Sequence, residues 1–184
     1  MKFSSATGKT KIDTDTKRII KDNILKLADK NGLVREKARK LMVKIGRPAI
    51  DYLAELENHP KAIARWEAVK TLGEIRDPLA APLLINALDD PSGGVRWLAA
   101  EGLAALRETG LAAILEALVI YPETVYLRQG AHHILVRIAE TTKDQAIDEM
   151  IRILNEPDAA YKIPLLARPY LEKISRKNKS KKVL

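Results

Sequence analysis

The residue types that most often carry chemistry are sparse in this chain. None of its 184 residues is a cysteine, and the histidines are His59, His132 and His133. Without cysteine there is no disulfide framework, thiolate zinc site or cysteine nucleophile. The two adjacent histidines would point about 100° apart on a helix and so could not bind one metal ion together. Enzymatic activity is therefore unsupported by the sequence, and we predict no catalytic residue, no metal site and no cofactor.

Basic groups are the second candidate source of function. The net charge is +8, but residues 1–50 carry 14 basic and 5 acidic groups and residues 161–184 carry 8 and 1. Residues 51–160 reverse the balance, with 10 basic and 18 acidic groups. Basic ends fit an anion, an acidic partner or nucleic acid, because neutralisation of phosphates dominates nucleic-acid affinity. A basic patch is predicted at Lys37, Arg39, Lys40, Lys44 and Arg47.

One arginine position reveals an internal repeat. It recurs at intervals of 30, 31 and 32 residues, at Arg35, Arg65, Arg96 and Arg128. Each arginine is followed by an alanine three positions later and by apolar residues seven and ten positions later. These offsets lie on one face of a helix, so each block predicts an amphipathic helix, which we name a first helix. A fifth, weaker copy runs through Ala167, Leu171 and Ile174.

Between the first helices lie other segments with helical apolar spacing, each followed by a proline-marked turn. These second helices are predicted over Pro48–Glu57, Pro78–Leu88, Gly110–Ile120 and Asp144–Asn155, and a further helix over Thr16–Asp29. The alternation typical of strands is missing, so the sequence predicts an all-α fold.

Aligned in this way, the chain resembles the HEAT-repeat superfamily, in particular the short repeats named after phycobilisome lyases. The resemblance rests on Asp89-Asp90-Pro91, Val95-Arg96, Ile75-Arg76-Asp77-Pro78 and Ile45-Gly46-Arg47-Pro48. It implies a right-handed α-solenoid, an armadillo/HEAT-like superhelix of about four to five helix-pair repeats, with first helices on the convex side and second helices on the concave side. We expect this solenoid over residues 15–175, between mobile basic tails at 1–14 and 176–184. The resemblance implies no particular reaction.

The sequence also predicts where the protein resides. No apolar stretch approaches the ~20 residues needed to cross a bilayer. The N-terminal residues lack the apolar core of a secretory signal. We expect a cytoplasmic protein without membrane association.

Two sets of repeat residues invite different interpretations. The four arginines are expected to be structural, reaching turn carboxylates such as Asp89 or Asp90, or carbonyls at helix ends. Trp66 and Trp97 each follow an arginine by one residue and lie opposite the apolar stripe. They either project from adjacent repeats as a binding surface or lie flat against the next helix.

The resulting function hypothesis is a non-catalytic adaptor or scaffold for protein–protein interaction. The second helices offer a surface that is acidic on balance and fits a basic or amphipathic segment of another protein, through Asp51, Tyr52, Glu55, Asn86 and Glu116. The alternative is nucleic-acid or anion binding through the basic ends. A third hypothesis, a subunit of a tetrapyrrole-lyase-like enzyme, rests on the family resemblance alone.

Overall fold

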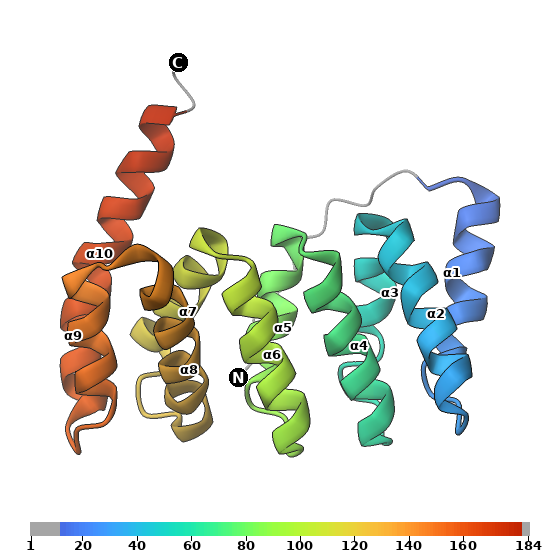
Figure 1. The fold of residues 1–184 in the computed structure, drawn as a ribbon, viewed down its shortest axis with the longest axis horizontal. Coiled ribbons are helices and arrows are strands. Elements are labelled where there is room, and N and C mark those ends of the chain that lie inside the picture. The colour runs from blue at the N-terminus through green and yellow to red at the C-terminus, as the bar shows by residue number, and fades with distance from the viewer. Residues whose placement is uncertain (1–11, 182–184) are drawn as a thin grey trace.

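The structure is a computed structural model that describes residues 12–181 (Figure 1). Residues 1–11 of the predicted N-terminal tail and 182–184 of the predicted C-terminal tail lie outside the described residues. Within the described range the secondary structure is helical and no strand occurs, which confirms the all-α prediction. The helices are α1 (Thr14–Lys26), α2 (Gly32–Ile45), η1 (Arg47–Ala49), α3 (Ile50–Ala54), α4 (Ala62–Ile75), η2 (Pro78–Ala80), α5 (Ala81–Ala87), α6 (Gly93–Ala105), α7 (Glu108–Ile120), α8 (Val125–Thr142), α9 (Gln145–Leu154) and α10 (Ala159–Lys181).

Local sequence signals set the helix boundaries. Asp13, Asn31 and Asp144 are N-caps whose side chains accept backbone N–H groups of the first turn. Proline shapes the second helices. Pro48 and Pro78 lie in short 3₁₀ turns that precede α3 and α5, because proline lacks the N–H that an α-helix interior needs.

The helices form two layers of a solenoid built from helix pairs, as the repeat predicted. In Figure 1 the first helices α2, α4 and α6 lie in front, and the second helices α3 and α5 lie behind them. Each first helix packs against the next, α2 on α4, α4 on α6 and α6 on α8. One continuous apolar cluster runs between the layers from Ile20 to Ala167.

The contact between α4 and α6 is especially close because it is made by two glycines. A Cβ atom added to Gly73 would lie 3.2 Å from the Cα atom of Gly102. Backbones can approach this closely only where side chains are absent. A side chain at either glycine would therefore push α4 and α6 apart.

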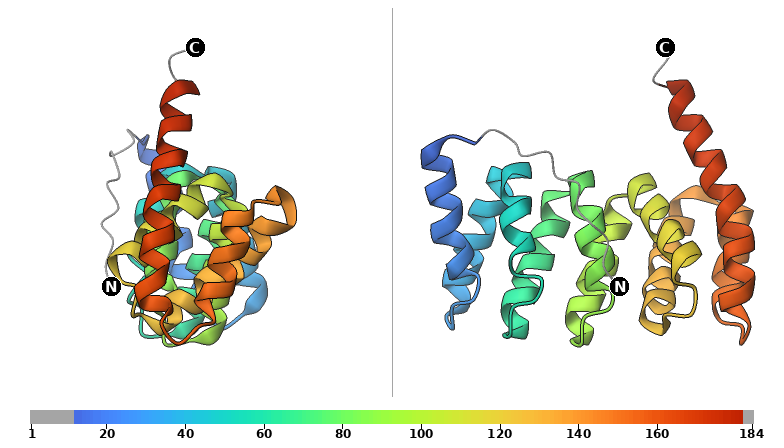
Figure 2. Two further views of the ribbon diagram at one scale, coloured as in Figure 1. Left: turned by 90° about the vertical axis from the view of Figure 1, so that its left-hand side faces the viewer. Right: turned by 180° about the vertical axis from the view of Figure 1, so that it is seen from behind.

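The C-terminal end departs from the predicted layer order. The sequence predicted α9 as a second helix and α10 as a weak fifth first helix. Instead α9 packs on α8, and α10 packs on α7 and α9. Figure 2 shows α10 on the side of the second helices and α9 on the side of the first helices. The last pair is thus reversed between the layers.

Helix α10 continues past residue 176, the predicted start of the C-terminal tail region, to Lys181. Residues 170–181 contain neither glycine nor proline, and their four lysines, one arginine and one glutamate favour helix. In Figure 1 the end of α10 projects beyond the other helices. Within residues 12–181, no helix combines the length and apolar character required to cross a membrane.

Candidate functional site

The four repeat arginines make one contact in common. In each, the Nη1 group donates to the backbone carbonyl six residues earlier, in the turn before its helix. The distances are 2.9 Å to Asp29, 2.8 Å to His59, 2.8 Å to Asp90 and 2.8 Å to Pro122. These carbonyls follow the end of a helix and lack a helical partner. The arginines therefore hold the turns that begin the first helices.

Three of the arginines also reach the next repeat, each through a different group. Arg35 donates to Glu67 on α4 at 3.0 Å. Arg65 makes two bonds to the Asp90 carboxylate, at 2.6 and 3.0 Å. The guanidinium of Arg96 lies 4.0 Å from the ring centroid of Tyr126 on α8. These arginines link successive repeats and are not presented to solvent as an anion site.

The predicted basic patch is partly neutralised. Arg39 binds Glu67 at 2.6 Å, Arg47 binds Asp77 at 2.8 Å, and Lys40 binds Glu36 at 2.6 Å. Lys37 and Lys44 have no ion-pair partner among the described side chains. Because carboxylates already hold three of the five cations, the patch offers less free positive charge than the sequence indicated.

The Arg47–Asp77 pair also changes the pKa of Asp77. Burial opposes ionisation of Asp77, but the hydrogen bond and charge of Arg47 and the N–H of Leu79 together hold the pKa of this carboxyl below its ordinary value. The pair joins the ends of two successive first helices.

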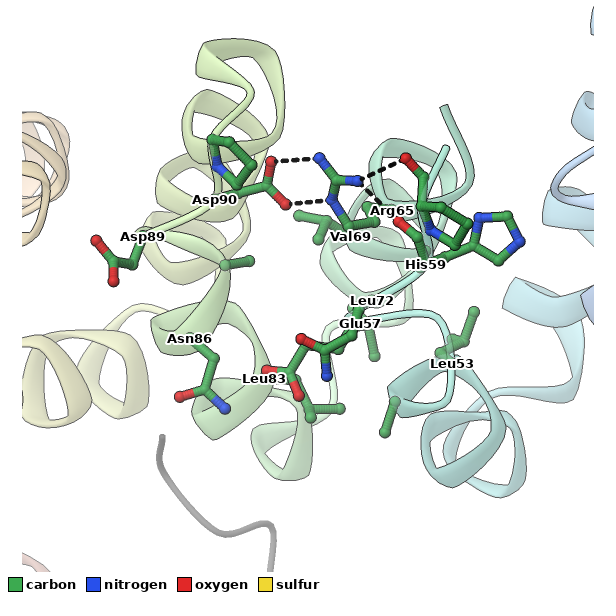
Figure 3. A pocket seen from close by; sticks show the side chains of 16 residues that line it. Leu53, Glu57, His59, Arg65, Val69, Leu72, Leu83, Asn86, Asp89 and Asp90 are labelled. Carbon is green, nitrogen blue, oxygen red and sulfur yellow. Dashed lines mark hydrogen bonds and ion pairs between the residues drawn. The ribbon is translucent and has the colours of Figure 1, made fainter. Parts of the chain in front are cut away.

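A cavity of about 380 Å³ opens beside the second helices α3 and α5 (Figure 3). Its apolar lining comes from three helices and consists of Leu53, Ala54, Ala68, Val69, Leu72, Leu83 and Ala87. Two proline turns complete it, one at 57–60 and one at 89–91. The Arg65–Asp90 ion pair forms one wall. The side chains of both are largely buried, at 12% and 7% exposure, so they neutralise each other inside the wall.

Three polar side chains differ in how they face this cavity. In Figure 3, Glu57 points into it from the turn after α3, whereas the polar groups of Asn86 and Asp89 are directed away from its centre. Among the described residues Glu57 has neither an ion pair nor a hydrogen-bond partner for its carboxylate. It supplies an uncompensated negative charge beside an apolar lining.

Most of the residues predicted for partner binding lie outside the cavity. Asn86 lines it, but Asp51, Tyr52 and Glu55 of the α3 region and Glu116 of α7 do not. Sequence reasoning missed Glu57 and the apolar lining. The sequence signal that could have indicated Glu57 is the position of acidic residues shortly before Pro60 and Pro91, which places carboxylates in two neighbouring turns.

The two tryptophans occupy equivalent positions and differ in exposure. Trp97 is 57% exposed, whereas Trp66 is half-buried against the core. The indole of Trp66 lies over the first turn of α6, where a Cβ atom on Gly94 would be 3.7 Å from it. The Nζ atom of Lys70 also lies over this ring, 4.7 Å from its centroid. The residue of α8 equivalent to Gly94 is Tyr126, so Trp97 finds no corresponding gap.

A second cleft, of about 730 Å³, is lined by α10, the start of α7 and the C-terminal parts of α6 and α8. Its lining mixes cations and carboxylates. Asp144 accepts a hydrogen bond from Tyr170 at 2.8 Å, and Lys173 lies 3.9 Å away. Burial opposes ionisation of Asp144, but Tyr170, the N–H of Ala146 and the charge of Lys173 hold its pKa below the ordinary value. Burial and the same hydrogen bond raise the pKa of Tyr170.

Two of the three histidines make side-chain contacts among the described residues. His133 bonds Glu101 at 2.5 Å between α8 and α6, and His59 accepts the N–H of Lys61. Within residues 12–181, no group of three histidine or acidic side chains is placed to hold a metal ion.

Comparison with known families agrees with this architecture. A family model described as HEAT repeats matches the chain twice, over residues 20–104 and 50–135. A search of curated proteins found no significant match. The matched region, residues 20–135, runs from α1 into α8 and includes the cavity and the four contacts of the repeat arginines with their own turns. The sequence repeat, the stacked helix pairs and this match together show that the chain belongs to the HEAT-repeat family.

Proposed function

We propose that the protein is a non-catalytic interaction module that binds a segment of another protein along its second helices. HEAT repeats generally mediate protein–protein interaction, since stacked helix pairs present an extended surface. The observation that carries the proposal is the cavity beside α3 and α5, in which an apolar lining meets an unpaired carboxylate. This combination is typical of a site for an amphipathic segment.

The charge of the second helices α3, α5 and α7 favours a basic partner, whereas α10 at the end of the same layer is basic. Neither α3, α5 nor α7 contains a lysine or arginine. Asp51, Glu55 and Glu116 add negative charge along the same layer. A segment with lysine or arginine beside apolar residues would be attracted to this surface, and an acidic segment would be repelled.

Charge reversal tests the proposal. The variant Glu55→Lys/Glu116→Lys should lose partners that the wild-type protein captures from source-cell extract, as quantified by mass spectrometry. Glu123→Lys is the matched control, because Glu123 is an exposed carboxylate in the turn before α8. Unchanged recovery by the double variant would contradict binding along the second helices.

A second candidate function, nucleic-acid binding, is favoured by the projecting end of α10. Lys173, Arg176 and Lys177 are exposed there, and Glu172 is the one acidic residue after residue 160. Arg176→Glu/Lys177→Glu should weaken the retention of a DNA or RNA oligonucleotide if this end binds phosphates. Wild-type protein that retains neither at ~50 mM salt would rule the candidate out.

A further inference from the structure

We propose that the cavity beside α3 and α5 is a pocket for a single lysine or arginine side chain of the partner, with Glu57 as its counter-ion. The inference rests on the proposed function, which requires a basic segment but does not say how it is recognised. It assigns that recognition to one cavity and one carboxylate.

The lining of the cavity fits the hydrocarbon part of such a side chain. Leu53, Val69 and Leu72 lie on the α3–α4 side, and Leu83 faces them from α5 (Figure 3). Lysine and arginine carry three or four methylene groups, which pack on apolar surface while the charged end keeps a polar partner. The lining therefore stabilises the stem and leaves the cationic end to find a carboxylate.

Glu57 is the lining carboxylate that can meet this cation. Arg65 already holds Asp90 through two hydrogen bonds, and Figure 3 shows Asp89 directed away from the cavity. Glu57 points inward and has no charged partner among the described residues. An ion pair formed there would be strengthened by the apolar surroundings.

The same geometry disfavours other occupants. An apolar side chain filling the cavity would take water from the carboxylate of Glu57 without giving it a hydrogen bond, which costs free energy. An acidic side chain would meet like charge. A cation on a long stem is the side chain that satisfies both the lining and Glu57.

The test uses small probes that isolate the side chain. Blocked amino acids, N-acetyl-X-methylamide with X as arginine, lysine or norleucine, are titrated into the full chain. Methyl NMR signals of Leu53, Val69, Leu72 and Leu83 report binding. Norleucine supplies a comparable stem without charge. We expect the two cationic probes to shift these signals in a saturable way, with Kd on the order of 1 to 10 mM for so small a ligand, and norleucine to bind more weakly.

Glu57→Gln separates charge from shape, and Glu123→Gln is the matched control, an exposed carboxylate outside the lining and outside the proposed binding surface. Glu57→Gln should raise the Kd of the cationic probes by about three- to tenfold, and Glu123→Gln should leave it unchanged. Equal binding of norleucine and arginine, no effect of Glu57→Gln, or no shift of the lining methyl signals would each overturn the assignment. If those results came with partner capture that still fails in Glu55→Lys/Glu116→Lys, the pocket would be wrong and the proposed function would stand.

Discussion

The junction between α4 and α6 and the end formed by α8 to α10 show what the repeat arginine does and does not determine. At the first junction Arg65 bonds both the carbonyl of His59 in its own turn and the carboxylate of Asp90 in the next repeat. At the second, Arg128 bonds the carbonyl of Pro122, and among the described residues it has no ion pair with a following repeat. Beyond Arg128 the last two helices exchange layers.

The contrast separates two roles of the arginine. The contact within its own turn occurs in all four repeats and depends only on sequence spacing. The contact with the next repeat depends on which residue that repeat supplies, and the layer order is regular where one is supplied. A carboxylate or an aromatic ring in the following repeat is thus the feature that accompanies regular stacking.

The largest effect on stability is expected from a side chain added at Gly110, in the middle of the solenoid, where there is no free space for it. A Cβ atom on Gly110 would lie 1.9 Å from the backbone oxygen of Leu103, which cannot move without shifting α6. Gly110→Ala should therefore lower the free energy of unfolding by about 3 kcal/mol or more in urea denaturation. Gly32→Ala is the control, because its nearest neighbour would be the end of the Arg35 side chain at 3.5 Å. Equal stability of the two variants would show that the α6–α7 turn is not tightly constrained.

Removing the arginine should affect the two regions differently. Arg65→Ala would leave Asp90, whose side chain is 7% exposed, without its counter-ion. Loss of one partner of such a buried pair costs about 3 kcal/mol. Arg128→Ala would remove one hydrogen bond to a carbonyl and should cost about 1 kcal/mol. The two unfolding free energies, measured side by side, test the comparison, and equal losses would contradict it.

Sequence spacing predicted the part of the fold that local rules control. The offsets from Arg35, Arg65, Arg96 and Arg128 predicted the first helices, and the prolines marked the turns. The layer of α10 could not be predicted in this way, because Ala167 and Ile174 fit the apolar face of either kind of helix. Which layer a helix joins is decided by its neighbours, here α7 and α9.

The cavity was beyond sequence reasoning for a related reason. Its lining combines residues more than thirty positions apart, such as Leu53 and Asp89, which meet only after the helix pairs stack. The residues chosen from the sequence were those outside the apolar stripes. The sequence predicted Glu57 as the last residue of a second helix, but α3 ends at Ala54 and Glu57 lies in the turn that follows, where helical periodicity does not set the direction of a side chain.

A pH-dependent contribution is expected at the C-terminal end. The pKa of Asp144 is lowered in the folded state, so its ionised form stabilises the fold above its ordinary pKa, near 4, and this contribution is lost as the pH falls through the lower folded value. Asp144→Asn keeps a residue able to cap α9 and removes the charge. The variant should be less stable than wild type by about 1 kcal/mol or less at pH 6, and the difference should shrink toward pH 3. A difference that is constant with pH would exclude a role for the charge.

The smallest effect on stability is expected at Trp97, where the comparison concerns two residues in equivalent positions. Trp66→Phe leaves the exposed Trp97 as the single tryptophan, and Trp97→Phe leaves the half-buried Trp66. Acrylamide should quench the fluorescence of the first variant more strongly, and its emission should lie at longer wavelength. Trp97→Phe should change the free energy of unfolding by less than about 0.5 kcal/mol, because over half of its side chain already contacts water.

Since Gly94 provides the space for Trp66 and Tyr126 occupies the equivalent space beside Trp97, Tyr126→Gly should allow Trp97 to pack down. Quenching of Trp97 that is the same with and without Tyr126 would show that another feature keeps this indole exposed.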